Sequence, residues 1–412
     1  MEQAVSPGGI GANLAKLQDT STDAQIPSQH DSSSTQEASL SGHSPEVAKR
    51  YARTKISLGI LGTLVFFALT LVLVATGATR AVEDFVRSFV SNNYIALLAF
   101  AAVLGSVEIV AAFPLRLYSG FLLEHKYNLS NQSFPAWVWE GAKGMFIGLL
   151  VGTPILLGLY YCLRTFGDSW WLPVGAIFFF VSVVLARVAP VLIFPLFYRF
   201  RPVADGEIKD RLVKLCRMAG MSVKGVFVFD MSKSTKKANA AFAGIGRSRR
   251  IILGDTLIAN FMNEEIETIV AHELGHFKLR HVWAALLVGT VNTFLGLYVT
   301  GEVYGASVSW FGFSAIDQLA ALPLLGFWLG VYSLVTGPVS NMISRSHERA
   351  ADRFAVLLSG KKEPFVNALR KLAVVNLSDT SPHPVVEFLF HSHPSIEKRI
   401  RAIECISVDV KQ

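Results

Sequence analysis

The residues best suited to chemistry lie in the segment AHELGH, residues 271–276. On a helix, positions i and i+4 lie on one face about 6 Å apart, so the imidazoles of His272 and His276 can reach one metal ion. Glu273 is offset from them and can reach a water molecule at that metal. The spacing predicts a metal site at which a carboxylate activates water for hydrolysis.

A catalytic zinc ion keeps three protein ligands and one open position for water, so the HExxH pattern needs a third ligand from another helix. The segment SRSHERAAD, residues 344–352, offers Glu348 as this ligand, with Asp352 one turn later on the same face. His347 is a further candidate, but it points elsewhere if Glu348 and Asp352 face the metal. Taken alone, Glu348 would be a solvated helix carboxylate.

The composition indicates a membrane protein. Hydrophobic residues make up 51% of the chain and charged residues 17%, which is less charge than a soluble globular chain carries. Six apolar runs approach the ~20 residues that a helix needs to cross a bilayer. They lie at about 56–77, 94–115, 142–163, 171–197, 282–302 and 318–340. The predicted fold is predominantly α, a multi-spanning helical membrane protein with a zincin-like HExxH catalytic domain that contains a small β-sheet.

The sequence divides into five segments. Residues 1–48 are polar and form a predicted disordered tail, because they cannot bury enough apolar surface to fold alone. Residues 49–198 form a membrane region with four spans. A catalytic insertion, 199–281, ends in the HExxH helix and precedes two further spans at 282–340. Residues 341–412 form a helical carboxyl-terminal part of the catalytic domain, which carries the third ligand.

The insertion is expected to combine helices with a small sheet. Helical apolar spacing marks 205–219, whereas VKGVFVFD at 223–230 reads as a strand. AAFAGIG at 240–246 and RIIL at 250–253 are the predicted strands of a hairpin around GRSRR. The HExxH helix is predicted to start near Asn263 as N-cap, with two glutamates in its first turn.

The span order brings the ligands to one side of the membrane. His276 lies about 9 Å before the fifth span if its helix continues, and Glu348 about 12 Å after the sixth. Two spans separate them, so they return to the same side. Lys and Arg number 33 on the proposed inner side and 3 in the outer loops. This asymmetry predicts that both termini are cytosolic.

The net charge of +7 and the pI of about 9.2 are compatible with nucleic acid or with positively charged loops on one side of a bilayer. The distribution of the charges favours the loops, so no nucleic-acid partner is expected. The three cysteines are far apart and are expected to be free thiols. The short carboxyl-terminal region and the tail favour a bacterial inner membrane, with the endoplasmic reticulum as the site if the chain is eukaryotic.

From about residue 51 to 404 the chain resembles the CAAX prenyl endopeptidases of the Ste24 type, a membrane branch of the M48 metallopeptidases. The stretches that carry the resemblance are PLRLYSGFLLEHKYNLSNQS (114–133), VLIFPLFYRFRPVADGEIK (191–209), NAAFAGIGRSRRIILGDTL (239–257), EEIETIVAHELGHFKLRH (264–281), SRSHERAAD (344–352) and HPSIEKRI (393–400).

The resemblance implies a role for each matching residue. His272, His276 and Glu348 match the zinc ligands of the family, and Glu273 matches its catalytic base. Asp352 matches an aspartate to which a proton-donor role is assigned, although it could equally fix the tautomer of a ligand histidine, the role we favour.

Three further residues match the family pattern. Asn239 matches an asparagine that contacts the substrate backbone, and the strand after it would be the edge to which a peptide adds. His393 matches a histidine that resembles the oxyanion-stabilising histidine of other zinc peptidases. Arg399 matches a motif arginine with an expected structural role. His383 and His391 are nearby rivals of His393.

The expected activity is zinc-dependent endopeptidase cleavage with one Zn²⁺ per chain. Expected partners are the lipid bilayer and a peptide or protein substrate. A C-terminal peptide segment and a membrane-associated protein are the candidate substrates. A quality-control protease of misfolded or stalled membrane proteins is one alternative, and a catalytically silent scaffold or transporter is another. The chain departs from the family in two respects. The family commonly has seven spans, whereas this sequence shows six, the first being replaced by the polar tail. The polar residues that line the family's membrane cavity are only partly recognisable, with Glu108, Lys143 and Arg187 lying within apolar runs.

Overall fold

The computed structural model describes residues 44–244 and 249–407, which belong to one compact unit and are mostly helical. Most of the predicted tail, residues 1–43, lies outside the described residues. Helix α2 begins at Pro45, so residues 45–48, which were assigned to the tail, are helical. Pro45 suits this first position because its missing N–H would have no partner within the helix.

Within residues 44–244 and 249–407, six helices are long and apolar enough to cross a membrane, in agreement with the six predicted runs. At most 28% of the residues in the most apolar window of any of them are buried, so their apolar side chains face outward, as lipid contact requires. The bounds of these segments, in which short irregular turns are included, are Pro45–Ala75, Asn93–Lys126, Phe134–Ser169, Trp171–Phe197, His281–Trp310 and Leu319–Ser359.

These segments contain eight α-helices: α2 (Pro45–Ala75), α4 (Asn93–Leu117), α5 (Leu123–Lys126), α6 (Phe134–Phe166), α7 (Trp171–Val188), α8 (Phe194–Phe197), α12 (His281–Trp310) and α13 (Leu322–Ser359). The remaining helices are α3 (Ala78–Phe89), α9 (Glu207–Met218), α10 (Asp255–Asn260), α11 (Asn263–Lys278), α14 (Lys362–Val375), α15 (Pro384–Phe390) and α16 (Ile396–Glu404). Helix α9 confirms the predicted helix at 205–219.

A four-stranded sheet has the order β1-β2-β4-β3. Its strands are β1 (Phe200–Pro202), β2 (Gly225–Phe229), β3 (Ala240–Ala243) and β4 (Arg250–Gly254). Strand β2 pairs parallel to β4, whereas β1 and β3 pair antiparallel to their neighbours. The β3–β4 hairpin was predicted, but β3 is shorter than the predicted strand, and residues 245–248 of its turn lie outside the described residues. Strand β3 is an edge strand.

The HExxH helix, α11, differs from the prediction at both ends. Met262, not Asn263, is its N-cap, and Glu265 Oε2 accepts a hydrogen bond from the Met262 N–H at 2.8 Å. At the other end α11 stops at Lys278, so the assumption that it continues into the fifth span was wrong. Arg280 adopts a left-handed conformation with φ of 59°, and α12 starts at His281 in a new direction.

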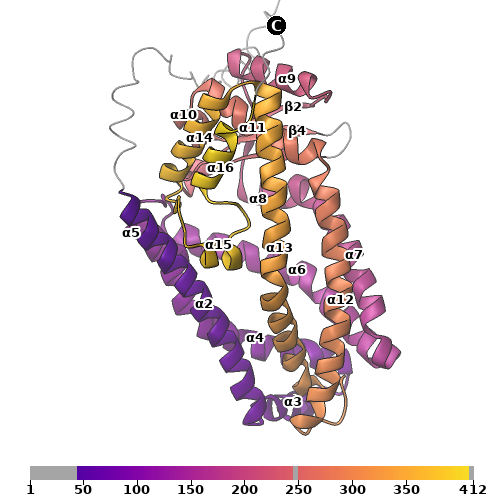
Figure 1. Cartoon of the computed structure of the whole chain (residues 1–412). Helices are drawn as coiled ribbons and strands as arrows, with labels where there is room; N and C mark the ends of the chain where they lie inside the picture. Colours follow the sequence, from indigo (N-terminus) through magenta and orange to yellow (C-terminus); the bar gives the residue numbers. More distant parts are fainter. Residues whose placement is uncertain (1–43, 245–248, 408–412) are drawn as a thin grey trace, which may run out of the picture. The chain divides into compact units, whose positions relative to one another are not determined.

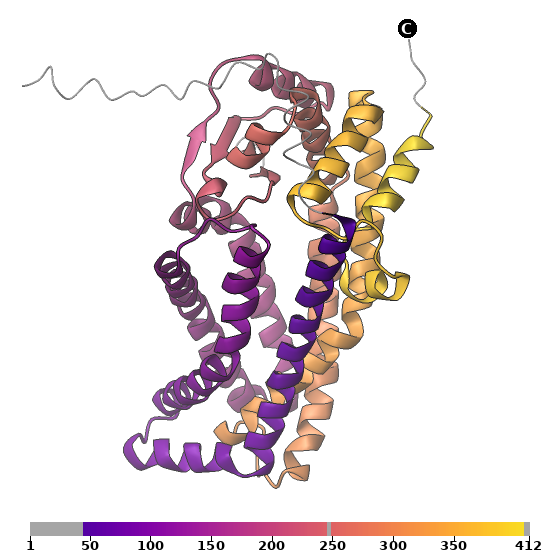
Figure 2. The ribbon, with the colours of Figure 1, turned by 90° about the vertical axis from the view of Figure 1, so that its left-hand side faces the viewer.

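Helix α13 joins the last membrane span to the catalytic elements without a break. It runs from Leu322 to Ser359, so residues 340 and 341, where the sequence suggested a boundary, lie inside one helix. The sheet, α11, α14 and α16 gather around its carboxyl end, while α15 lies part-way along it (Figure 1; Figure 2 shows the same unit turned by 90°). This helix therefore couples the membrane region to the site.

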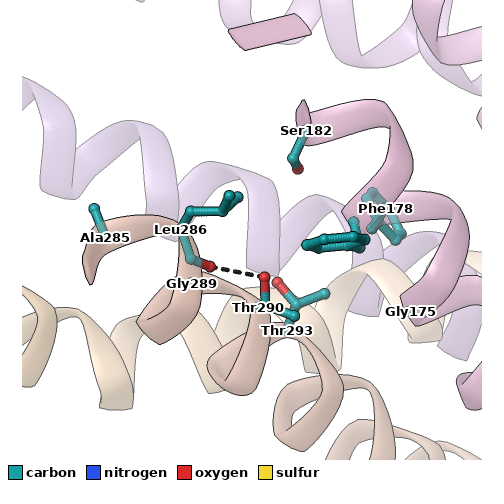
Figure 3. Close-up of a pocket in the computed structure, with 9 residues that line it drawn as sticks. Gly175, Phe178, Ser182, Ala285, Leu286, Gly289, Thr290 and Thr293 are labelled. Carbon is teal, nitrogen blue, oxygen red and sulfur yellow. Dashed lines mark hydrogen bonds between the residues drawn. The ribbon is translucent and has the colours of Figure 1, made fainter. Parts of the chain in front are cut away.

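A pocket of about 250 Å³ separates α7 from α12 in the membrane region. Figure 3 shows Phe178 and Ser182 on one side and Leu286 and Thr290 on the other. The Thr290 hydroxyl donates to the Leu286 carbonyl at 2.7 Å, so this polar group of the lining is satisfied within its own helix. The pocket begins one turn after His281 and takes no part in the arrangement described next.

Candidate metal centre

Helices α11 and α13 pack closely because Gly275 stands between the two histidines of the HExxH motif. A Cβ atom at Gly275 would lie 3.1 Å from Ala351 Cα and 3.2 Å from Ala351 O, closer than real Cβ contacts normally come. The absence of a side chain at this position therefore allows the α13 backbone to approach α11. The approach brings Glu348, on α13, to the histidine pair on α11.

The three predicted ligands converge with the separations that a tetrahedral metal needs. His272 Nε2 lies 3.1 Å from His276 Nε2 and 3.4 Å from Glu348 Oε2, and His276 Nε2 lies 3.2 Å from Glu348 Oε1. With metal–ligand distances of about 2.05 Å, tetrahedral ligands stand about 3.3 Å apart. These atoms form the one group of metal-ligating geometry found among the described residues.

In the described part of the chain, one oxygen atom of this cluster lacks a hydrogen-bond donor, and a bound cation would take the place of that donor. Glu348 Oε2 is buried and has no hydrogen bond of acceptable geometry among the described residues, although His393 Nδ1 lies 2.9 Å away. A buried carboxylate oxygen without a partner is costly. The donor set of two imidazoles and a carboxylate is also one that zinc accepts, so the residues present fit a metal ion.

Asp352 and Arg399 hold the first ligand histidine. Asp352 Oδ1 lies 2.9 Å from His272 Nδ1, and both carboxylate oxygens accept from the Arg399 guanidinium at 2.6 and 2.9 Å. A proton on His272 Nδ1 leaves Nε2 free to bind a metal. Burial alone would lower the pKa of His272, but the Asp352 and Glu348 carboxylates beside its ring raise that pKa to about 9.

The second ligand histidine is held by a residue that sequence reasoning missed. His281 Nδ1 lies 3.0 Å from His276 Nδ1, and the His281 ring stacks on His347 with centroids 4.2 Å apart and planes at 8°. His347 therefore supports the site and is not a ligand. His281 was hidden because its position depends on the helix break at Arg280, for which the sequence gives no signal.

Glu273 has the environment expected of a group that exchanges protons. Burial raises the pKa of its carboxyl, and the nearby charges of His272 and His276 oppose this shift. A raised pKa brings a carboxylate closer to the range in which it can accept a proton and release it again.

His393, predicted from the resemblance, reaches the metal cluster. Its side chain is 63% exposed, and Nδ1 faces Glu348 Oε2. The rival histidines do not: His383 accepts from the Val385 N–H at the start of α15. The described hydrogen bonds of His391 are made by its backbone, whose N–H donates to the Glu387 carbonyl at 3.1 Å and whose carbonyl accepts from Arg345 at 2.6 Å. His393 is thus the loop histidine that the structure brings to the centre.

Asn239 lies exposed immediately before the edge strand β3. Asn376 fixes the preceding residue, because its side chain accepts from Ala238 N–H at 2.9 Å and donates to Ala238 O at 3.3 Å. Strand β3 packs against α11, and the rings of Phe242 and Phe277 lie 5.1 Å apart. An open strand edge therefore runs beside the helix that carries the ligands.

Comparison with known families decides the class of enzyme. The model of peptidase family M48 matches residues 202–407, and that of the CAAX prenyl protease N-terminal domain, described by five membrane helices, matches residues 25–199. The chain belongs to peptidase family M48. With its six candidate spans it is a multi-pass membrane metalloprotease.

Relatives of this M48 peptidase come from bacteria and eukaryotes. An uncharacterized metalloprotease of Bacillus subtilis, YhfN, is 30% identical over 87% of this chain and 85% of its own length. CAAX prenyl protease 1 of Saccharomyces cerevisiae is 29% identical with the same coverage. The crystal structure of S. mikatae Ste24p superposes with a TM-score of 0.78 at 26% identity, over 87% of this chain and 88% of that one. The M48 peptidase is therefore similar to CAAX prenyl protease 1, and a silent scaffold or transporter is not favoured.

Proposed function

We propose that the metal is zinc, about one ion per chain, and that His272, His276 and Glu348 hold it. The observation that carries this proposal is the convergence of the two imidazole Nε2 atoms, 3.1 Å apart, on the Glu348 carboxylate, whose two oxygens lie 3.4 Å from His272 Nε2 and 3.2 Å from His276 Nε2. Two neutral imidazoles and one carboxylate leave a fourth position open for water, as catalysis requires.

The enzyme hydrolyses peptide bonds with Glu273 as the general base. When bound, zinc supplies Lewis acidity that lowers the pKa of water toward about 7. Glu273 takes a proton from the attacking water and then delivers it to the leaving amine. The raised pKa of Glu273 favours both halves of this transfer.

Asp352 acts as a positioning residue and not as the proton donor. Its carboxylate is already engaged by His272 and Arg399, which leaves it little freedom to reach a leaving group. His393 is the oxyanion donor: it comes from an exposed loop, it faces the metal cluster, and the three ligands are already supplied by other residues. Loss of such a donor typically costs ~2.7–4 kcal/mol in the barrier.

The substrate peptide adds to the open edge of β3, where Asn239 contacts its backbone. The similarity to CAAX prenyl protease 1 favours a substrate whose cleaved bond lies near its carboxyl end at the membrane surface. A requirement for a lipid on the substrate distinguishes this function from quality-control cleavage of membrane proteins, which would not depend on a lipid. Both termini face the cytosol. The membrane is the inner membrane if the chain is bacterial and that of the endoplasmic reticulum if it is eukaryotic.

Purified enzyme tests the assignment with a fluorescence-quenched peptide ending in a farnesylated CAAX sequence and with the same peptide without the lipid. We expect wild type to contain about one zinc per chain and to cleave. Glu273→Gln should keep the metal and lose cleavage, because an amide cannot take the proton. Absence of zinc from active wild type, or full activity of Glu273→Gln, would overturn the proposal.

His393→Ala tests the oxyanion role separately. It should lower kcat by roughly 100- to 1,000-fold with little change in zinc content or KM. The matched change His391→Ala should do much less. Loss of zinc from His393→Ala would instead mean that His393 serves the ligand Glu348.

A further inference from the structure

The loop that carries His393 is attached to α13 at both of its ends. On its amino-terminal side the carbonyl of His391 accepts a hydrogen bond from Arg345 Nη1 at 2.6 Å. On its carboxyl-terminal side Ser395 is the N-cap of α16, and Arg399, one turn into that helix, pairs with Asp352. Only a short exposed stretch around His393 lies between these two attachments.

Arg345 is buried, and its contacts converge on the end of α15. The same Nη1 donates to the carbonyls of Glu387 at 3.0 Å and Phe388 at 3.5 Å, besides that of His391. The Glu387 carbonyl also accepts from the His391 N–H at 3.1 Å, and a cation is favourable at the carboxyl end of a helix, where the last carbonyls lack a full set of partners. Within the described residues, all hydrogen bonds of the Arg345 side chain go to these three carbonyls, which are therefore its principal partners.

One face of α13 presents this arginine together with the metal site. Asn341, Arg345, Glu348 and Asp352 follow at spacings of four, three and four residues, which is one stripe of a helix. Asn341 donates to the Leu389 carbonyl at 2.9 Å, Glu348 supplies a ligand, and Asp352 holds His272. The residues that bind metal and those that hold the His393 loop therefore share one rigid element.

We propose that Arg345 is a positioning residue for His393: by holding the Glu387 and His391 carbonyls it fixes the loop so that His393 faces the metal cluster. The inference rests on the oxyanion role proposed for His393. Arg345 touches neither substrate nor metal, so its effect on the reaction passes through His393. The effect is also distinct from that of Arg399, which holds a ligand histidine through Asp352.

A double-mutant cycle tests this inference. Arg345→Met should lower kcat tenfold or more while zinc content and KM stay near wild type. In the His393→Ala background the same change should cost less than about twofold, because the group that it positions is gone. Arg345→Lys, which can still donate to carbonyls, should recover part of the activity. Asn341→Ala is the matched control, since it loosens α15 without touching the His391 carbonyl, and it should cost little.

Three results would overturn the inference. Additive losses in the double mutant would show that Arg345 acts independently of His393. Loss of zinc from both Arg345→Met and Arg345→Lys would show that it serves Glu348, three residues further along the helix. Equal losses in Asn341→Ala and Arg345→Met would indicate general weakening of α15. If His393→Ala alone left kcat unchanged, the proposed role of His393 would fail, which is a separate outcome from these three.

Discussion

At the scale of single residues, each of the two proposed histidine ligands faces a partner outside the proposed ligand set. The Asp352 carboxylate faces Nδ1 of His272, and His281 faces the same nitrogen of His276. Such partners typically account for 10- to 100-fold in metal affinity. The two imidazoles of the proposed metal site are thus held in place by contacts that exist without an ion.

Zinc affinity is expected to tighten as the pH rises from about 6 to about 8. In the metal-free chain the pKa of His272 is about 9, so its ring is protonated over this interval and must lose a proton when Nε2 binds zinc. Release of one proton gives about a tenfold gain in apparent affinity per pH unit. Competition with a chelator measures the slope. A zinc affinity that does not change with pH in the wild type would contradict the assignment of His272 as a ligand. Asp352→Asn is the control: it should lower the pKa of His272 and so weaken the pH dependence.

At the scale of elements, the sequence predicts helices and strands that have a periodic apolar pattern. It does not predict a helix end that depends on the backbone conformation of a single residue. The six spans, the hairpin and the pairing of the HExxH helix with Glu348 followed from periodicity and span order. The end of α11 did not, because HFKLRHVWAALL reads as one helix and Arg280 adopts a left-handed conformation without a glycine to signal it. The place of His393 came only from the resemblance, since no local pattern links it to Glu348, 45 residues earlier in the chain.

Strand β3 is expected to bind substrate through alternate residues. Asn239 O accepts from the Gly254 N–H at 2.9 Å, and hydrogen-bonded pairs alternate along an antiparallel ladder. Ala241 therefore faces β4 with its backbone, whereas Ala240 directs its own toward the open edge. Ala240→Pro should raise KM roughly fivefold, for the loss of about 1 kcal/mol of hydrogen bonding, and leave zinc content and thermal stability nearly unchanged.

Ala241→Pro is the contrasting variant, because it breaks the ladder to β4. It should lower the unfolding temperature. Steady-state kinetics and thermal unfolding of both variants measure the difference. If Ala240→Pro were the less stable of the two, or if its KM were unchanged, the peptide would not add to this edge in the proposed register.

At the scale of the whole molecule, one helical hairpin, α12 and α13, connects the histidines of α11 to Glu348. Helix α12 starts three residues after α11 ends, crosses the apolar region, and α13 returns to end in the catalytic elements. The return explains how residues 276 and 348 meet, and it requires an even number of crossings between them. The family model for residues 25–199 is described by five membrane helices, whereas the described residues of that region hold four candidate spans.

The orientation of the chain is the last prediction. Lys and Arg number 33 in the segments on the catalytic side and 3 in the outer loops, and such a bias places the catalytic side in the cytosol. Reporter fusions at residue 40 and at the carboxyl terminus should therefore both report the cytosol. The two ends and the catalytic lobe would then share one compartment, and a fusion in the loop 303–317, which holds no Lys or Arg, should report the opposite side. Termini on opposite sides would mean an extra or a missing span between the two fusion points, and the pairing of His276 with Glu348 would then have to be reconsidered.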